Sequence, residues 1–290
     1  DFTMEVERCM RVLDGAVLVL DAVAGVQAQS ETVWRQMRRH GVPAVCFVNK
    51  CDRPGADFLA AVASLKSRLG VRGVPVQYPV FDADGALRGV ADLLTMRTLE
   101  FPPDASGPPV EAELPPGLAD EAGVLRSELI DTLAEEDEHL LACVLEDRVP
   151  ELDLVRAALR RRTLSGDLVA VLCGAALRNV GVQPVLDAVV DYLPSPADLP
   201  PVRGVEPSGG KPIELRPEPG EPLCALAFKL HADKHGDLTC VRIYSGSMQA
   251  GQQVWNPRTG QTERVARPPR VHASSPEALE VPGQRARGRV

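Results

Sequence analysis

The sequence has no long hydrophobic segment and no Cys-x-x-Cys pair. None of its apolar runs approaches the roughly 20 residues that a helix needs to cross a bilayer, so we expect no membrane partner. The seven cysteines include no Cys-x-x-Cys motif, and most lie within apolar runs: Cys46, Cys173, Cys224 and Cys240. This pattern is typical of buried thiols in a reducing compartment and argues against disulfides or a metal site.

The sequence also lacks an excess of basic residues and a glycine-rich phosphate loop. Its formal net charge of −8 argues against a free-standing nucleic-acid-binding protein, because phosphate contacts come from a basic face. The pattern Gly-x-x-x-x-Gly-Lys-Ser/Thr, which holds nucleotide phosphates and places a Mg²⁺-binding hydroxyl, occurs nowhere in the chain. We therefore expect neither a catalytic residue for phosphoryl transfer nor a metal ligand within these residues.

What is present indicates an α/β protein. The chain has 290 residues and a hydrophobic content of 44%, which suffices for a core and favours two or more domains. Apolar runs at residues 15–21, 44–48 and 169–173 are each followed by a helical pattern. Such runs are typical of buried strands, so the sequence predicts a doubly wound parallel sheet.

The run at 44–48 ends in Asn49-Lys50-Cys51-Asp52. The Asp52 carboxylate is an acceptor with two oxygens, and it can take two hydrogen bonds from N1–H and the 2-amino group of guanine. Adenine has no such donor pair and would leave the carboxylate unpaired. Lys50 can lay its aliphatic stem across the purine, and Asn49 can reach the N7 edge or join neighbouring loops. The alternative is a plain surface turn after a strand.

The run at 169–173 ends in Gly174-Ala175-Ala176-Leu177. Small residues after a strand let backbone N–H groups approach a ligand closely, here the guanine carbonyl oxygen. The alternative is an ordinary strand-to-helix turn in which Gly174 supplies permissive geometry. Ligands of open α/β sheets bind at the carboxyl ends of strands, which favours a shared nucleotide site.

Several segments carry a family resemblance. Residues 1–8 and 12–17 resemble the stretch that follows the Asp-x-Pro-Gly-His motif of translational GTPases. Together with Asn49–Asp52, the segments 173–179 and 192–196 resemble elongation factor G in sequence and order. Within this family, four segments are similar to the mitochondrial ribosome-releasing branch: residues 32–36, 46–50, 223–229 and 242–246.

The resemblance implies a GTPase that binds GTP or GDP through Asn49, Lys50, Asp52 and the segment Ala175, Ala176 and Leu177. It implies Mg²⁺ in the full-length protein, with ligands outside this chain, and a water-positioning His that falls two residues before Asp1. We therefore expect a fragment that is inactive alone. The implied partners are the mitochondrial ribosome and ribosome recycling factor, with ribosomal RNA bound mainly by domains absent here. The implied setting is a monomer in the mitochondrial matrix.

Two other functions remain open. One is a translocating elongation factor G, which is also a GTPase. The other is a non-catalytic module that binds a ribosomal partner without nucleotide. The expected fold is a partial doubly wound P-loop GTPase domain at residues 1–198, with an inserted α+β subdomain at about 79–166. A Pro/Gly-rich linker at 199–222 and an incomplete β-barrel at 223–290 follow.

Local patterns within these regions predict further elements. The insert contains acidic helical stretches at 128–145 and 153–162, and the acidic run at 135–138 is interpreted as a solvated helix face instead of paired catalytic carboxylates. Strands are expected at 225–229, 239–244 and 253–256. His231 and His235 fit a hairpin loop better than a metal pair, since no third ligand is in reach. The Arg-rich run at 284–289 is interpreted as the result of truncation or aberrant splicing, and the alternative is a basic tail that contacts RNA.

Overall fold

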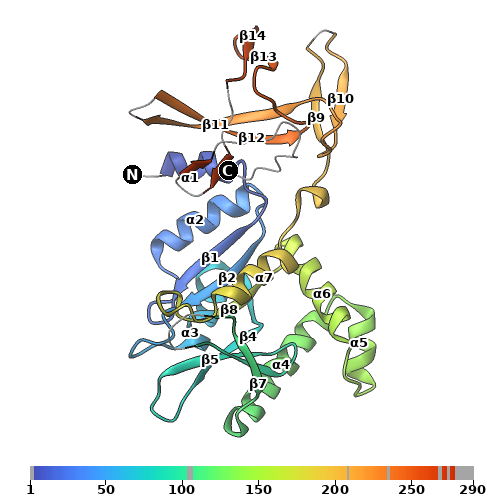
Figure 1. Cartoon of the computed structure of the whole chain (residues 1–290). Helices are drawn as coiled ribbons and strands as arrows, with labels where there is room; N and C mark the ends of the chain where they lie inside the picture. The colour runs from blue at the N-terminus through green and yellow to red at the C-terminus, as the bar shows by residue number, and fades with distance from the viewer. Residues whose placement is uncertain are drawn as a thin grey trace. The chain divides into compact units, whose positions relative to one another are not determined.

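The chain forms two compact units in the computed structural model, residues 13–194 and residues 1–12 with 195–290 (Figure 1). The structure describes residues 3–102, 107–207, 209–233, 236–266, 270–272 and 275–277. The predicted His235 and the Arg-rich run at 284–289 lie outside the described residues. The larger unit is a mixed α/β structure built on a parallel sheet, which confirms the predicted fold class.

The central sheet has four parallel strands in the order β1-β2-β8-β3. They are β1 (Ala16–Asp21), β2 (Ala44–Asn49), β8 (Leu168–Cys173) and β3 (Arg72–Pro75). Every residue of β8, and of β2 up to Asn49, is buried, as expected for central strands covered on both faces. The edge strand β1 instead alternates, with Leu18 and Leu20 buried and Val17 and Val19 exposed.

Helices follow the strands as the sequence predicts. Between β1 and β2 lies α2 (Ala28–Arg39), and after β2 comes α3 (Phe58–Ser64), which continues as the π-helical turn η1 (Leu65–Leu69). Asp57 caps α3 by accepting a hydrogen bond from the Ala60 N–H at 2.9 Å. The last helix of this unit, α7 (Val182–Tyr192), follows β8 and the short 3-10 helix η3 (Ala176–Arg178).

An antiparallel sheet and three helices lie between β3 and β8 in the sequence. The sheet has the order β4-β5-β6-β7, formed by β4 (Gln77–Phe81), β5 (Leu87–Asp92), β6 (Arg97–Glu100) and β7 (Val110–Glu113). A short 3-10 helix, η2 (Pro116–Leu118), leads into the helices α4 (Ala119–Ala134), α5 (Glu138–Leu145) and α6 (Leu152–Ser165).

The predicted single helix at 128–145 is wrong, because the chain turns between α4 and α5. Asp137 is the cause: its Oδ1 accepts hydrogen bonds from the N–H groups of His139 and Leu140, each at 3.0 Å. Aspartate in this position begins a new helix. The acidic run at 135–138 therefore spans a helix boundary. The carboxylates of Glu135, Glu136 and Asp137 contact arginines, with Glu135 bound to Arg72 at 2.7 Å.

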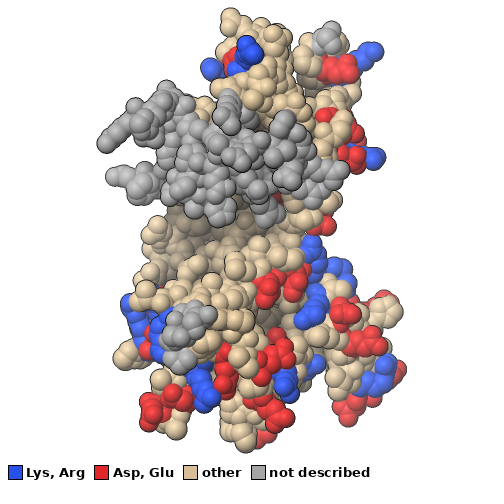
Figure 2. Space-filling view, viewed as in Figure 1, with Lys and Arg blue, Asp and Glu red and all other residues tan. Residues whose placement is uncertain are grey.

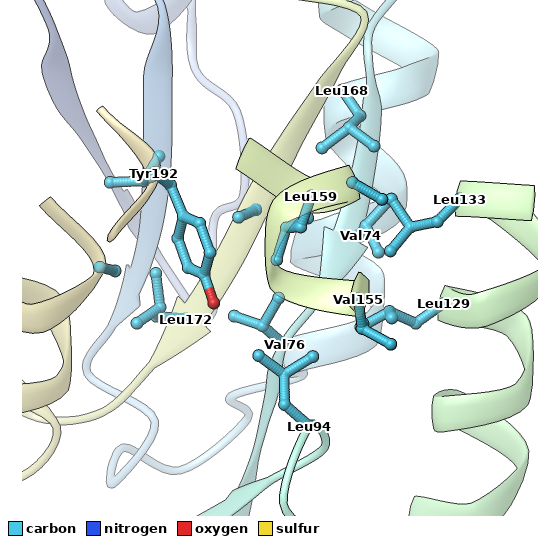
Figure 3. Packing of buried hydrophobic residues seen from close by; sticks show 14 of the residues in the cluster. Val74, Val76, Leu94, Leu129, Leu133, Val155, Leu159, Leu168, Leu172 and Tyr192 are labelled. Atoms are coloured by element: carbon cyan, nitrogen blue, oxygen red, sulfur yellow. The ribbon is translucent and has the colours of Figure 1, made fainter. Parts of the chain in front are cut away.

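One hydrophobic core joins the parallel sheet to α4, α5, α6 and α7. Leu159 and Val155 of α6 lie among buried side chains of β8, α4 and α7 (Figure 3). Leu168, Leu133 and Leu159 are fully buried. The shared core ties the helices of the 79–166 region to the parallel sheet.

The smaller unit consists of short antiparallel pairs. Its helices are α1 (Thr3–Met10) and the 3-10 helix η4 (Pro196–Asp198). Its strands are β9 (Val202–Val205) with β10 (Pro212–Leu215), β11 (Cys224–Asp233) with β12 (Gly236–Ser245), β13 (Gln253–Asn256) with β14 (Gln261–Arg264), and β15 (Arg270–His272) with β16 (Ser275–Glu277). The strands expected at 225–229, 239–244 and 253–256 all lie within this set, whereas closure into a barrel stays a prediction.

A buried arginine joins the two ends of this smaller unit. The Arg242 guanidinium donates a hydrogen bond to the Val12 carbonyl at 2.8 Å and lies 5.3 Å from the centre of the Tyr244 ring. The Tyr244 hydroxyl in turn donates to the Arg11 carbonyl at 3.3 Å. The segment after α1 is thereby fixed to β12, which explains why residues 1–12 belong to the unit that contains 195–290.

None of the helices in the described part of the chain has the length and apolar character that a membrane crossing requires.

The shared core predicts how strongly the larger unit depends on α6. We expect Leu159→Ala to lower the free energy of unfolding by about 2–5 kcal/mol, because it removes a fully buried side chain and leaves a cavity. Urea titration followed by the fluorescence of Trp34, which is buried in α2, measures the change. Leu145→Ala is the control, since Leu145 is 77% exposed, and we expect it to change stability by less than about 0.5 kcal/mol. Equal losses in the two variants contradict this description of the core.

Candidate guanine-binding site

The predicted site residues lie where three parallel strands end. Asp21 is the last residue of β1 and is in register with Asn49, the last residue of β2. Cys173 ends β8, in register with Val48. Because parallel strands have their carboxyl ends at one edge, the loops that follow them meet there. The structure thus places the segments 49–52 and 174–177 side by side.

Asn49 joins these two loops. Its side-chain Oδ1 accepts hydrogen bonds from the Lys50 N–H at 2.8 Å and from the Ala176 N–H at 2.9 Å. Backbone bonds add to this contact, from Gly174 N–H to the Val48 carbonyl and from Cys51 N–H to the Gly174 carbonyl, each at 3.0 Å. Of the two roles considered for Asn49, the structure shows the one that ties neighbouring loops together.

Lys50 is held at both ends. Its backbone has a φ of 66°, a left-handed conformation that non-glycine residues rarely adopt. Its ammonium Nζ lies 2.7 Å from Asp21 Oδ2, in an ion pair whose side chains are 40% and 23% exposed. The Lys50 stem between these two fixed ends is open to solvent in part, and a flat ligand can pack against it.

Asp21 is a residue that the sequence analysis did not single out. The Lys50 ammonium, followed by the Val23 N–H, holds the pKa of the Asp21 carboxyl below its usual value. The carboxylate therefore stays charged at neutral pH, and the ion pair is lost only when pH falls through that lowered pKa. The sequence did contain a signal, because Asp21 ends an apolar run in the same way as Asn49 does.

Asp52 is exposed and accepts no hydrogen bond from the described residues. Cys51, its neighbour, turns inward and donates from Sγ to the Val48 carbonyl at 3.3 Å. Burial raises the pKa of the Cys51 thiol to about 11, so it stays protonated and unreactive at neutral pH. Within the segment 49–52, Asp52 is the side chain whose acceptors are free for a ligand.

The three predicted residues of the second loop differ in their surroundings. Ala175 is buried, and its N–H donates to the Val180 carbonyl at 3.0 Å. The Ala176 N–H is bound to Asn49 as described, whereas the Leu177 N–H has no partner among the described residues. The Leu177 side chain is fully exposed. Leu177 therefore offers both a free donor and an uncovered apolar side chain.

Gly174 makes this loop possible. A Cβ at this position would lie 2.2 Å from the Val180 carbonyl oxygen, which no side chain tolerates. The requirement at Gly174 is thus close backbone approach. No group of three or more His, Cys, Asp or Glu side chains in the described part of the chain could hold a metal ion.

The described geometry meets the needs of a purine base. It offers a carboxylate for a donor pair, a fixed lysine stem and an apolar side chain for ring faces, and a free N–H for a carbonyl oxygen.

Comparisons with known proteins agree on one family. The model of the elongation factor Tu GTP-binding domain matches residues 1–195. Elongation factor G 2 of Geobacter metallireducens is 46% identical over 281 residues, which cover 97% of this chain and 41% of that protein. Elongation factor G of Thermotoga maritima is 43% identical over 291 residues, covering 99% of this chain and 42% of that protein. The chain thus spans about two fifths of the length of these relatives.

A solved structure has a similar fold. A crystal structure of a protein from Thermus thermophilus superposes with a TM-score of 0.77 at 25% sequence identity, and it covers 96% of this chain and 38% of that one. The match of the family model over residues 1–195 includes both predicted site loops. The chain therefore belongs to the family of translational GTPases that is defined by the elongation factor Tu GTP-binding domain.

Proposed function

We propose that the loops 49–52 and 174–177 form the base-reading half of a GTP site in an elongation-factor-G-type GTPase. The observation that carries the proposal is the Asn49 side chain, whose Oδ1 joins the two loops through Lys50 N–H and Ala176 N–H. It brings a selective acceptor, Asp52, and a free donor at Leu177 to the same edge of the sheet.

Each part of the purine then has a partner. Asp52 accepts from N1–H and the 2-amino group, which are the donors that distinguish guanine from adenine. The Lys50 stem and the exposed Leu177 side chain pack against the ring faces, and the loop 175–177 donates an N–H to the guanine carbonyl. Asn49 holds the two loops in register through its Oδ1, and its amide Nδ2 can donate to N7 of the purine.

The loops 49–52 and 174–177 are proposed to bind the base, and the phosphates and Mg²⁺ need further groups. No phosphate-binding glycine loop occurs in the sequence, and no cluster of potential metal ligands exists among the described residues. If bound in the proposed full-length protein, Mg²⁺ would supply charge neutralisation at the transferred phosphoryl group.

The proposed site of action is the mitochondrial ribosome. The segments 32–36, 46–50, 223–229 and 242–246 resemble the ribosome-releasing branch of the family, which supports disassembly of ribosomes after termination together with ribosome recycling factor. That role requires localisation in the mitochondrial matrix. The rival is translocation, and it is favoured by one specific observation, namely that both relatives described above are named elongation factor G.

Contact with ribosomal RNA is proposed to lie mainly in parts that this chain does not contain. Figure 2 shows Lys and Arg mixed with Asp and Glu over the larger unit on the face in view. Such mixing gives no extended basic area there, whereas binding to phosphate backbones needs one. The third possibility, a non-catalytic module that binds a ribosomal partner without nucleotide, predicts no response to guanine nucleotides.

Asp52→Asn tests the base-reading assignment. We expect it to weaken guanosine binding by a factor of about 10 to 100, because a charged acceptor of two hydrogen bonds is replaced by an amide that donates. Xanthosine, which carries an oxygen in place of the 2-amino group, should bind more tightly to the variant. Ligand-observed NMR at millimolar nucleoside measures both affinities.

Asp82→Asn is the matched control, since Asp82 lies in the β4–β5 turn and accepts only from local N–H groups. Unchanged affinities for both nucleosides contradict the role of Asp52.

A ribosome assay separates recycling from translocation. The protein that carries this chain, isolated from its natural source, should split mitochondrial ribosomes into subunits when GTP and ribosome recycling factor are both present. It should not support poly-phenylalanine synthesis in place of elongation factor G. Light scattering follows the splitting. Efficient peptide synthesis without splitting assigns the protein to translocation.

The chain of 290 residues is expected not to hydrolyse GTP in multiple turnovers, even with ribosomes present. Phosphoryl transfer depends on positioning and charge stabilisation around the γ-phosphate, and an intact base site cannot replace them. Release of inorganic phosphate measures the turnover, with a purified ribosome-dependent GTPase as the positive control. Repeated turnover by the chain alone overturns this expectation and directs the search to a catalytic residue within it.

A further inference from the structure

We propose that Asp21 is a positioning residue for nucleotide binding, which holds the Lys50 ammonium so that the Lys50 stem is ready to receive the purine ring. The inference rests on the proposed function, since it concerns the same base site. It adds a residue from β1 to a site otherwise built from the loops after β2 and β8.

The Asp21 carboxylate is fixed in place by its own loop. Its Oδ1 accepts hydrogen bonds from the Val23 N–H at 2.8 Å and the Ala24 N–H at 3.4 Å. The Asp21 backbone carbonyl accepts from the Gly25 N–H at 2.8 Å. Oδ2 is left to face Lys50, at 2.7 Å from its Nζ. The carboxylate thus has one orientation, and the lysine adapts to it.

The loop that carries Asp21 is itself clamped to neighbouring elements. The Ala22 N–H donates to the Asn49 carbonyl at 2.9 Å. Val26 is bound on both sides, by its N–H to Ser64 Oγ at 3.0 Å and by its carbonyl to an Arg68 N–H at 2.6 Å. Ser64 ends α3 and Arg68 lies in the π-helical turn η1. These bonds make Asp21 a rigid anchor instead of a mobile surface carboxylate.

This anchor restricts the conformational freedom of the Lys50 side chain. A lysine side chain has several freely rotating bonds, and it loses that freedom when a ring packs against its stem. Here the Lys50 N–H is bound to Asn49 at one end of the stem, and the ammonium is bound to Asp21 at the other. Part of the ordering has therefore occurred before a ligand arrives, and this favours binding.

A purely electrostatic role makes the opposite prediction. Removing a negative charge near the site of an anionic nucleotide strengthens binding, and salt reduces the gain. Positioning instead predicts weaker binding when Asp21 is neutralised. It also predicts an equal effect on guanosine and inosine, because the stem packs against any purine, whereas Asp52 discriminates between bases through the 2-amino group.

The test uses guanosine and inosine, which carry no phosphate and no net charge, with the whole 290-residue chain and ligand-observed NMR. We expect Asp21→Asn to raise the Kd for both nucleosides by the same factor, roughly threefold to tenfold. Lys50→Met keeps an apolar stem but removes the ammonium, and we expect a similar loss. The double variant should bind no more weakly than the single variant with the higher Kd, because both changes break the same interaction.

Glu135→Gln is the matched control. It breaks the Arg72–Glu135 ion pair, which has the same 2.7 Å separation and lies in the same unit, and it should leave both Kd values unchanged. Trp34 fluorescence verifies that each variant is folded. If Asp21→Asn does not fold, the Kd values of Lys50→Met decide. The Lys50 side chain is partly exposed, so we expect its replacement to leave the fold intact.

The outcomes separate the two levels of the proposal. Unchanged or tighter guanosine binding in Asp21→Asn or Lys50→Met, or additive losses in the double variant, overturns the role of Asp21 and leaves the reading of guanine by Asp52 intact. No binding of guanosine by the unmodified chain overturns the proposed function, and the role of Asp21 falls with it.

Discussion

The burial of β2 and β8 in the middle of the parallel sheet is the constraint on which the proposed site depends. Strands covered on both faces leave no room for polar side chains until they end. Because the strands are parallel, both ends fall at one edge, where Asn49 and the segment after Cys173 meet. The bond from Ala176 N–H to Asn49 Oδ1 turns this adjacency into a fixed geometry. Without the shared register, the two loops would not lie close enough to contact one ligand.

The parts of the fold that periodicity controls could be predicted from the sequence. The three apolar runs became β1, β2 and β8, and the helical stretch after β1 became α2. Their residues obey the local rule that apolar runs pack into sheets and amphipathic stretches cover them. The prediction of one helix at 128–145 was wrong for an equally local reason, since Asp137 caps a new helix and ends the helical pattern before it.

For the candidate site, the sequence alone indicates only residues that lie close together along the chain. Asn49, Lys50 and Asp52 are adjacent in sequence, so their pattern is visible without a structure. The partnership of Asp21 with Lys50 joins residues that lie 29 positions apart, and it follows from strand register. Which N–H group of the second loop is free is likewise a matter of tertiary contacts, because Ala176 donates to Asn49 and Ala175 to Val180.

The central claim is that two loops of one sheet edge read guanine. The most direct measurement is the map of backbone amide chemical shifts of ¹⁵N-labelled chain as guanosine is added, with adenosine as the comparison. The account predicts guanosine-specific shifts concentrated at Lys50, Asp52, Ala176 and Leu177, with little change at the far end of the sheet. Shifts that are equal for both nucleosides, or that lie away from these loops, contradict it.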